Sequence, residues 1–477
     1  MKYSNSLTLL ALCLWAISTS TAMERPNVIL IVADDLGYAD LSCYGASDIK
    51  TPHLDKLASG GLKFTQFYAG SAVCSASRAA LLTGCYPVRV GIPAVVGAEV
   101  NYGLSRKEHT LAEALKQVGY RTGLFGKWHL GSQMIFRPSQ HGFDENYGTI
   151  GSNDMGKRVN KVPPSLEMRR KGLAGVEVLE GDQVVETNPD QRFLTRKSTT
   201  RALDFIERHS NEPFFVYVPY NMPHTPLFVS PKWEGTSQRG LYGDVIQEMD
   251  HEVGRILNLL EEKKLEEKTI VIFTSDNGPW LIFGNHGGLA GPLSGGKKQL
   301  LEGGPRVPCI LRYPKALKKG LQIDQLVSAI DLAPTIIKWC HGQEATQPID
   351  GIDMRDFFEN PQAMASPRKH LAYYDRYGLV AVRNQRYKLF FPHLDRQVPN
   401  PEKIGMDGMR GEVMKIKKAQ ALYDLKHDLS ESRDLQKDLP DVVKKLTHFA
   451  KQQRSMLGDD ITSTKGTANR PSETISK

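Results

Sequence analysis

The chain has 477 residues and a formal net charge of +8, with 40% hydrophobic and 24% charged residues. This composition is typical of a folded globular protein and excludes disorder over long stretches. The length predicts one large domain and a smaller one. The modest positive charge would attract an anionic ligand, but no basic tract with interleaved aromatic residues predicts nucleic-acid binding.

The first 22 residues are typical of an export signal. Lys2 supplies a positive charge, residues 7–17 form an apolar core, and residues 20–22 fit a small-x-small cleavage site. The apolar run is too short to span a bilayer comfortably, and no later segment has the pattern of a membrane span. We therefore expect a periplasmic or secreted protein that begins near Met23 and has no membrane span after signal cleavage.

Five cysteines remain after the expected cleavage. An odd number in an exported protein indicates that at least one is not in a disulfide. If Cys74 is set apart, the sequence leaves the pairing of the other four open: Cys43, Cys85, Cys309 and Cys340.

Short apolar runs then alternate with amphipathic stretches, which predicts an α/β domain. The first run, residues 27–33, is continuously apolar, as in strands buried on both faces of a parallel sheet. Helical spacing recurs between Val245 and Leu260, and residues 155–188 predict a loop insertion or small ribbon near the site. Further strands are expected at 121–125, 214–218 and 269–274, and helices that stop before a glycine at 75–83 and 109–118.

The pattern changes after about Cys340, where strands at 379–382 and 386–391 and a helix at 438–453 predict a smaller α+β domain. The expected organisation is a signal peptide (1–22), a catalytic α/β domain (23–340), a C-terminal α+β domain (341–457) and a flexible tail (458–477).

Polar residues follow the predicted strands of the first domain. In open α/β sheets, ligands bind outside the carboxyl ends of the strands, so these side chains are expected to converge. Crowded carboxylates would repel one another without a cation, and such oxygen ligands suit calcium or magnesium rather than zinc. Taken singly, each is more commonly part of a turn or cap. The residues are Asp34 and Asp35, Lys127 and His129, His224, and Asp276 with Asn277.

Cys74 begins a predicted helix, whose positive dipole end stabilises anions, and Arg78 lies one turn further on. A lone cysteine is more commonly a buried structural residue. Lys127, His129 and Lys297 would add positive charge around a tetrahedral anion, and histidines can transfer protons to a leaving oxygen.

Five ordered motifs resemble the type I sulfatases of the alkaline phosphatase superfamily, whose fold is a large mixed sheet flanked by helices. The most specific is CSASRAALLTG at 74–84, in which Ala76 stands where many relatives have proline. The others are residues 26–28 with 33–37, GKWHLG at 126–131, SDNG at 275–278, and residues 297–308.

The resemblance implies that a maturase oxidises Cys74 to formylglycine, whose hydrated aldehyde attacks the sulfur. It further implies one Ca²⁺ ion bound by Asp34, Asp35, Asp276, Asn277 and the modified Cys74. Arg78 would hold the nucleophile, and Lys127 and Lys297 would bind sulfate oxygens. His224, with Lys297, would protonate the leaving oxygen, and His129 would help to release sulfate. The segment at 151–156 is similar to a loop of the arylsulfatase A and N-acetylgalactosamine-6-sulfatase branch, which implies that Ser152 and Asn153 contact sulfate.

These observations predict a sulfuric ester hydrolase that acts on a sulfated small molecule or, as the preferred hypothesis, a sulfated carbohydrate. Two alternatives are a phosphodiesterase or phosphonate monoester hydrolase on the same fold, and a non-catalytic sulfoglycan-binding protein. The complete set of matched residues argues against the binding protein, and metal- and Cys74-dependent turnover would separate the possibilities.

Overall fold

The computed structural model describes residues 25–156, 166–397 and 403–475. The predicted signal peptide therefore lies outside the described residues. Within them, no helix is long and apolar enough to cross a membrane.

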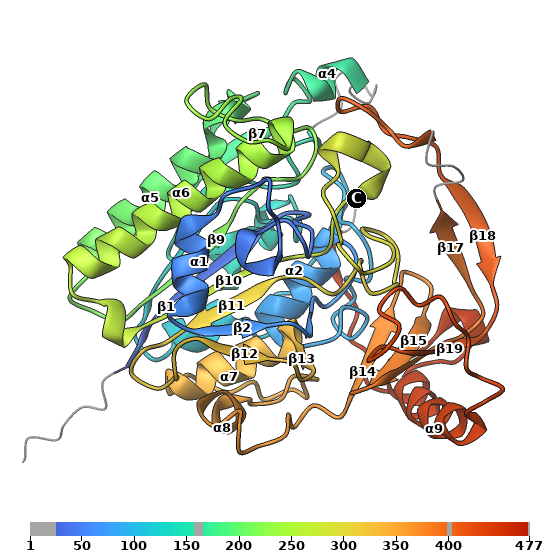
Figure 1. Ribbon diagram of the computed structural model, residues 1–477. Helices are drawn as coiled ribbons and strands as arrows, with labels where there is room; N and C mark the ends of the chain where they lie inside the picture. The colour runs from blue at the N-terminus through green and yellow to red at the C-terminus, as the bar shows by residue number, and fades with distance from the viewer. Residues whose placement is uncertain (1–24, 157–165, 398–402, 476–477) are drawn as a thin grey trace, which may run out of the picture.

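A ten-stranded mixed sheet forms the centre of the larger domain (Figure 1). Its five central strands, from β10 to β6 in the order below, run parallel, and antiparallel strands follow on both sides. In spatial order the strands are β12 (Leu321–Ile323), β2 (Leu62–Phe64), β11 (Cys309–Arg312), β10 (Thr269–Ser275), β1 (Asn27–Ala33), β9 (Phe214–Pro219), β5 (Arg121–Phe125), β6 (Glu145–Thr149), β7 (Glu177–Glu180) and β8 (Gln183–Thr187).

Strand β1 shows why its sequence is continuously apolar. Leu30 points into one hydrophobic core, while Ile29 and Ile31 point into the core on the opposite face, and all three are fully buried. Because successive side chains of a strand alternate between faces, a sheet covered on both sides requires apolar residues at every position.

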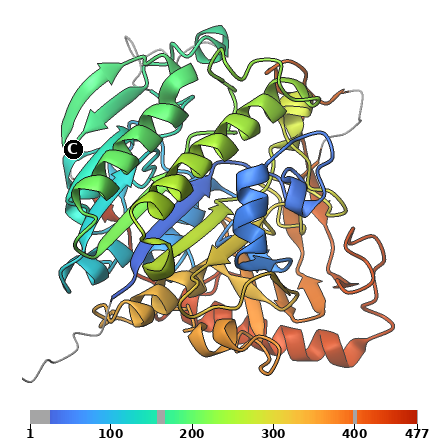
Figure 2. The same cartoon turned by 60° about the vertical axis from the view of Figure 1, so that its left-hand side comes forward.

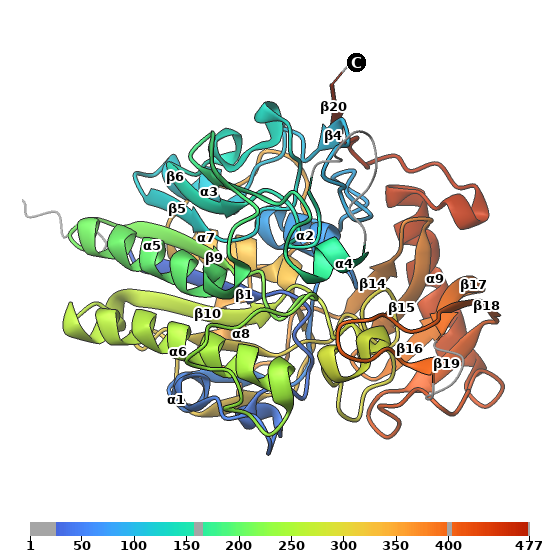
Figure 3. The same ribbon diagram turned by 90° about the horizontal axis from the view of Figure 1, so that it is seen from above.

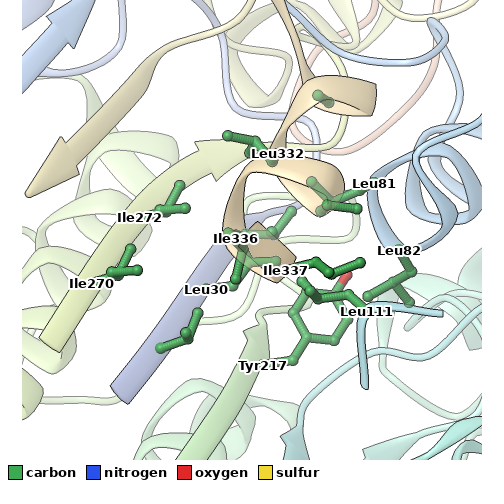
Figure 4. Close-up of a cluster of buried hydrophobic side chains, with 14 of the residues drawn as sticks. Leu30, Leu81, Leu82, Leu111, Tyr217, Ile270, Ile272, Leu332, Ile336 and Ile337 are labelled. Carbon is green, nitrogen blue, oxygen red and sulfur yellow. The ribbon is translucent and has the colours of Figure 1, made fainter. Parts of the chain in front are cut away.

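Helices supply the two covering layers. On one face lie α1 (Pro52–Ser59), α5 (Leu194–Arg208) and α6 (Gly240–Glu262), which cross the sheet in Figure 2. On the other lie α2 (Cys74–Thr83), α3 (Leu111–Lys116) and α7 (Leu332–Trp339). Figure 4 shows Leu30 and Ile272 of the sheet beside Ile336 of α7, with Leu81 and Leu82 of α2 completing the cluster.

The smaller domain lies to one side of the sheet domain (Figure 3). Helix α9 (Pro440–Leu457) packs on its four-stranded antiparallel sheet, and a separate ribbon projects from it. The sheet order is β14 (His370–Tyr374), β15 (Leu379–Asn384), β16 (Tyr387–Phe390) and β19 (Ala421–Asp424), and the ribbon pairs β17 (His393–Gln397) with β18 (Met414–Lys418).

Residues that follow the predicted domain boundary at Cys340 still pack on the large domain. Met354 and the short helix α8 (Arg355–Glu359), through Phe357 and Phe358, still belong to the core of the large sheet. The predicted insertion at 155–188 contains α4 (Leu166–Arg170) and a small ribbon, the β7–β8 hairpin, which extends the large sheet through β6. Its residues 157–165 lie outside the described residues.

The C-terminal segment is not the frayed tail that its polar sequence predicts. Within residues 458–475, strand β20 (Glu473–Thr474) pairs with β4 (Tyr102–Gly103) of the large domain. Arg470 donates two hydrogen bonds to the carboxylate of Glu108, both at 2.7 Å. A short parallel pair, β3 (Phe67–Tyr68) with β13 (Val327–Ser328), lies elsewhere in the large domain.

Candidate functional site

The predicted polar residues gather at the carboxyl ends of the parallel strands. Strands β1 and β10 end in register, with Ala33 opposite Ser275, so Asp34 and Asp276 follow as neighbours. The backbone N–H of Asp276 donates to the Ala33 carbonyl at 3.1 Å. The structure buries every residue of the predicted site: Asp34, Asp35, Cys74, Arg78, Lys127, His129, Ser152, Asn153, His224, Asp276, Asn277 and Lys297.

Gly126 allows the end of β5 to deliver Lys127 into the site. Its φ of 144° lies in the region that favours glycine, and a Cβ atom there would come within 2.0 Å of the Pro219 carbonyl oxygen. The same close approach lets the Lys127 N–H donate to Pro219 at 2.6 Å and the Gly126 N–H donate to Tyr147 at 2.8 Å.

Cys74 is the first residue of α2, at the positive end of the helix dipole. Burial raises the pKa of its thiol, although Lys127 and Lys297 act in the opposite direction. An unmodified Cys74 is therefore a neutral thiol, whereas the thiolate is the nucleophilic form of cysteine. The helix N-terminus can stabilise an anion at this position, but the neutral thiol is a poor nucleophile.

Arg78 contacts two other residues of the site, Asp276 and Lys127. Its Nε and Nη2 lie 2.9 and 2.8 Å from Oδ2 of Asp276, and its Nη1 donates to the Lys127 carbonyl at 2.9 Å. The ammonium group of Lys127 in turn forms an ion pair with Asp34. This fork geometry is specific to arginine.

The carboxylate of Asp35 lies close to three other residues of the site. Asp35 has a φ of 68°, and its carboxylate lies 2.7 Å from Lys297 Nζ and accepts a hydrogen bond from Asn277 Nδ2 at 2.7 Å. His224 Nε2 lies 3.7 Å from the same carboxylate. Asp35 thus links residues from three separate segments.

Burial acts on the pKa of all three carboxylates of the site, and charged neighbours decide the direction of the shift at Asp34. Burial, followed by the neighbouring charge of Asp34, raises the pKa of Asp276 to about 7. Burial also raises the pKa of Asp35 against the opposing charge of Lys297. Burial would raise the pKa of Asp34 too, but Lys127 and the other nearby cations hold it well below its usual range.

The residues fit a hard divalent cation. Asp34, Cys74 and Asp276 can bring ligand atoms within 4.8 Å of one another, as can Asp34, Asp35 and His224. Two buried oxygen atoms, Oδ1 of Asp34 and Oδ1 of Asn277, have no hydrogen-bond partner among the described residues, a situation that is costly unless a ligand satisfies them. Carboxylate and amide oxygens are ligands that calcium prefers.

The two histidines are neutral for the same physical reason. Burial lowers the pKa of His129 well below 6.5, with Lys127 and Arg78 adding to the effect. Burial and Lys297 do the same to His224. His224 Nδ1 lies 2.6 Å from the Thr225 carbonyl oxygen. If Nδ1 donates a hydrogen bond there, Nε2 is unprotonated and can accept a proton. Neither ring nitrogen of His129 has a hydrogen-bond partner among the described residues.

Ser152 and Asn153 lie beyond the end of β6. Ser152 Oγ accepts a hydrogen bond from Lys127 Nζ at 3.2 Å and lies 3.4 Å from His224 Nε2. Asn153 Nδ2 instead donates to Gln191 at 3.1 Å and to the Pro226 carbonyl at 3.0 Å. Ser152 is therefore in contact with the catalytic candidates, while the Asn153 amide is held by its own neighbours.

Sequence reasoning missed two residues that shape the site. The ring centroid of Trp280 lies 4.4 Å from Lys297 Nζ and 5.4 Å from that of His224, and the signal for it was its position three residues after Asn277. Gln191 fixes Asn153 through reciprocal hydrogen bonds, but nothing in its surrounding sequence indicates this contact.

Comparison with known proteins agrees with this geometry. The sulfatase family profile matches residues 26–342, and the profile for the C-terminal region of aryl-sulfatase matches residues 366–475. The chain is 36% identical to N-acetylgalactosamine-6-sulfatase of the dog. The match covers 80% of this chain and 75% of the dog protein. It is 38% identical to bovine arylsulfatase A, with 78% and 75% covered.

A solved structure gives the same result for the fold. The structure of Ps i-CgsB in complex with k-i-k-neocarrahexaose superimposes with a TM-score of 0.75 and 27% identity, covering 93% of this chain and 95% of that one. The chain therefore belongs to the sulfatase family, as an arylsulfatase-like sulfuric ester hydrolase.

Proposed function

We propose that this sulfatase hydrolyses sulfate esters of a carbohydrate, using a formylglycine formed from Cys74 and a Ca²⁺ ion held by Asp34, Asp35, Asp276 and Asn277. The observation that carries the proposal is the buried carboxylate cluster around Cys74, whose unpartnered oxygens fit a cation. A sugar substrate is supported by two similarities, to an enzyme named for N-acetylgalactosamine-6-sulfate and to a structure that holds a neocarrahexaose.

When present, the hydrated aldehyde would supply the attacking oxygen, and Ca²⁺ would stabilise charge on the sulfuryl oxygens. The protein's own cations match this task. Three carboxylates are already balanced by Arg78, Lys127 and Lys297, so a divalent cation would leave the site positive and attractive to an anionic ester.

Proton transfer is assigned to Lys297 and the histidines. Although burial opposes it, the charge of Asp35 raises the pKa of Lys297, so its ammonium group is protonated near neutral pH and can give a proton to the leaving oxygen. The unprotonated Nε2 of His224 takes part only by passing on a proton that it first accepts. His129 is neutral, and neither of its ring nitrogens has a hydrogen-bond partner in the part of the chain that the structure describes, which suits a base during sulfate release. The expected export signal in residues 1–22 supports action in the periplasm or outside the cell.

The first test is peptide mass spectrometry of the segment that contains Cys74, in protein made together with a maturase. We expect the mass loss that converts a thiol into an aldehyde. The modified protein should release sulfate from an aryl sulfate, and chelation of Ca²⁺ should abolish this release. The Cys74→Ala variant is the matched control and should be inactive.

Sulfated sugars then test the substrate class. Release of sulfate from sulfated oligosaccharides supports the proposal, whereas activity confined to small aryl or choline esters would count against a carbohydrate substrate. Faster turnover of a phosphonate monoester or phosphodiester would favour the alternative hydrolase. Binding of sulfated sugar without turnover, in protein shown to carry formylglycine, would favour a binding protein.

A further inference from the structure

A cavity of about 360 Å³ lies between the two domains, next to the candidate site. The large domain lines it with residues 71–73 and 93–95 and with Lys298 and Leu300. The smaller domain lines it with the turn between β14 and β15, with the β17–β18 ribbon, and with Tyr374. Neither domain forms this cavity alone.

Two residues of the cavity lining are chain neighbours of residues in the candidate site. Val73 directly precedes Cys74, and Lys298 directly follows Lys297. The ammonium groups of Lys297 and Lys298 lie 4.4 and 4.3 Å from the centroid of the same Trp280 ring. Lys298 therefore links the cavity lining to the catalytic cation Lys297 through the shared Trp280 ring.

The cavity lining has more cationic side chains than carboxylates. Four cationic side chains line the cavity, and no ion pair among the described residues joins any of them to a carboxylate: Lys298, Arg376, Arg396 and Lys415. Its two carboxylates are engaged by backbone N–H groups. Asp375 accepts from Tyr377 and Gly378 at 2.7 and 3.0 Å, and Asp395 accepts from Arg396 at 2.7 Å.

The β17–β18 ribbon places two of these cations where packing does not require them. Arg396 lies directly opposite Lys415 across the antiparallel pair, and like charges at such positions destabilise a ribbon. In addition, burial, Lys297 and Arg396 together lower the pKa of Lys298 to about 8. A bound anion would relieve both sources of repulsion.

We propose that this cavity binds a second anionic group, sulfate or carboxylate, on the sugar next to the one whose sulfate is cleaved. The preferred substrate is then a polyanionic oligosaccharide rather than a monosulfated sugar. This inference rests on the proposed function of the adjacent site, because it assigns the same substrate two points of attachment.

The test compares the binding of two probes by calorimetry, in a Cys74→Ala background that prevents turnover. The probes are maltotriose carrying a single sulfate and chemically persulfated maltotriose. We expect persulfated maltotriose to bind about tenfold more tightly, since one additional charge-assisted contact of about 1.4 kcal/mol corresponds to a tenfold change in affinity. Arg376→Ala and Arg396→Ala should each remove most of this preference.

The matched control is Arg433→Ala, which removes the same charge from a largely exposed side chain of the smaller domain that does not line the cavity. It should leave the preference unchanged, and thermal unfolding should show all three variants folded. If Arg376→Ala and Arg396→Ala weaken the preference no more than Arg433→Ala does, the proposal is wrong. If the preference depends on Arg396 but matured wild-type protein hydrolyses no sulfate ester, the anion site stands and the proposed hydrolysis fails.

Discussion

His129 illustrates at the scale of one residue how the site separates function from stability. Its ring is buried, neither nitrogen has a hydrogen-bond partner among the described residues, and its φ is 64°. A buried polar group without a partner costs stability. The fold therefore gains no hydrogen bond from this ring, which is available to act on a substrate.

We predict that His129→Asn lowers kcat by about 10² to 10⁴, the usual contribution of a general acid or base. Asparagine tolerates a positive φ better than most residues, and no hydrogen bond is lost, so the free energy of unfolding should change by less than about 1 kcal/mol. Sulfate release and denaturant unfolding measure the two quantities. His370→Asn, a half-buried histidine packed on Phe449, is the control. If His129→Asn instead lowered the free energy of unfolding by several kcal/mol, the loss of activity would reflect unfolding, and His129 would have a structural role.

The grouping of the predicted site residues could be derived from the sequence, but many of their partners could not. Asp34, Cys74 and Arg78 stand in motifs whose residue types indicate their roles. Arg376 and Arg396 lie in ordinary polar segments, and only the packing of the two domains brings them to a common cavity beside Cys74.

At the scale of elements, the long buried strands were predicted best. β1 has the predicted bounds, and β9 and β10 each extend one residue further than predicted, because an apolar run between polar turns marks both ends. The helix predicted at 109–118 is shorter, since Thr110 and Glu113 form a capping box that starts α3 at Leu111. Strands of two or three residues, such as β2 and β13, are too short to show a periodic pattern.

Helices α1 and α6 are joined by a buried carboxylate with a testable pH dependence. Asp250 of α6 accepts backbone N–H groups of His53 and Leu54 at 3.2 and 2.8 Å, at the start of α1. Burial raises the pKa of Asp250 from 3.8 to about 7. The folded state therefore holds a proton that the unfolded state has lost, and this contribution to stability is lost as the pH rises from about 4 to about 7.

We predict that Asp250→Asn, which cannot ionise, gains stability relative to wild type as the pH rises. The difference in the free energy of unfolding should move in the variant's favour by up to about 4 kcal/mol between pH 4 and pH 8. Denaturant unfolding at both pH values measures it, with the largely exposed Asp204→Asn as control. A pH-independent difference would show that Asp250 is ionised throughout this range.

At the scale of the whole molecule, one buried ion network joins the two domains. Lys388 of β16 lies 2.9 Å from both Glu302 of the large domain and Glu431 of the smaller one. Arg383 lies 3.7 Å from Glu302. Removing one partner of such a network leaves a buried charge uncompensated, so we expect the two domains to unfold together. No local pattern predicts this network, because its members come from distant segments.

The C-terminal segment adds a second connection, and its contribution can be measured separately. Arg470 pairs with the buried carboxylate of Glu108, and the chain passes so close to Gly91 that a Cβ atom there would lie 2.1 Å from the Ser472 nitrogen. These contacts fall on residues 89–108, the segment that lines the cavity at 93–95. The end of the chain should therefore hold one wall of the cavity in place.

We predict that Arg470→Ala costs about 2 kcal/mol of stability, less than a fully buried pair would because Arg470 is partly exposed. Hydrogen exchange should accelerate in residues 89–108 while β1 and β10 stay protected, since local opening follows the loss of local contacts. Lys465→Ala, an exposed cation in the same segment, is the control. If both variants gave wild-type exchange at 89–108, the segment would be the loosely attached tail that its polar composition predicts, and the cavity wall would depend on other contacts.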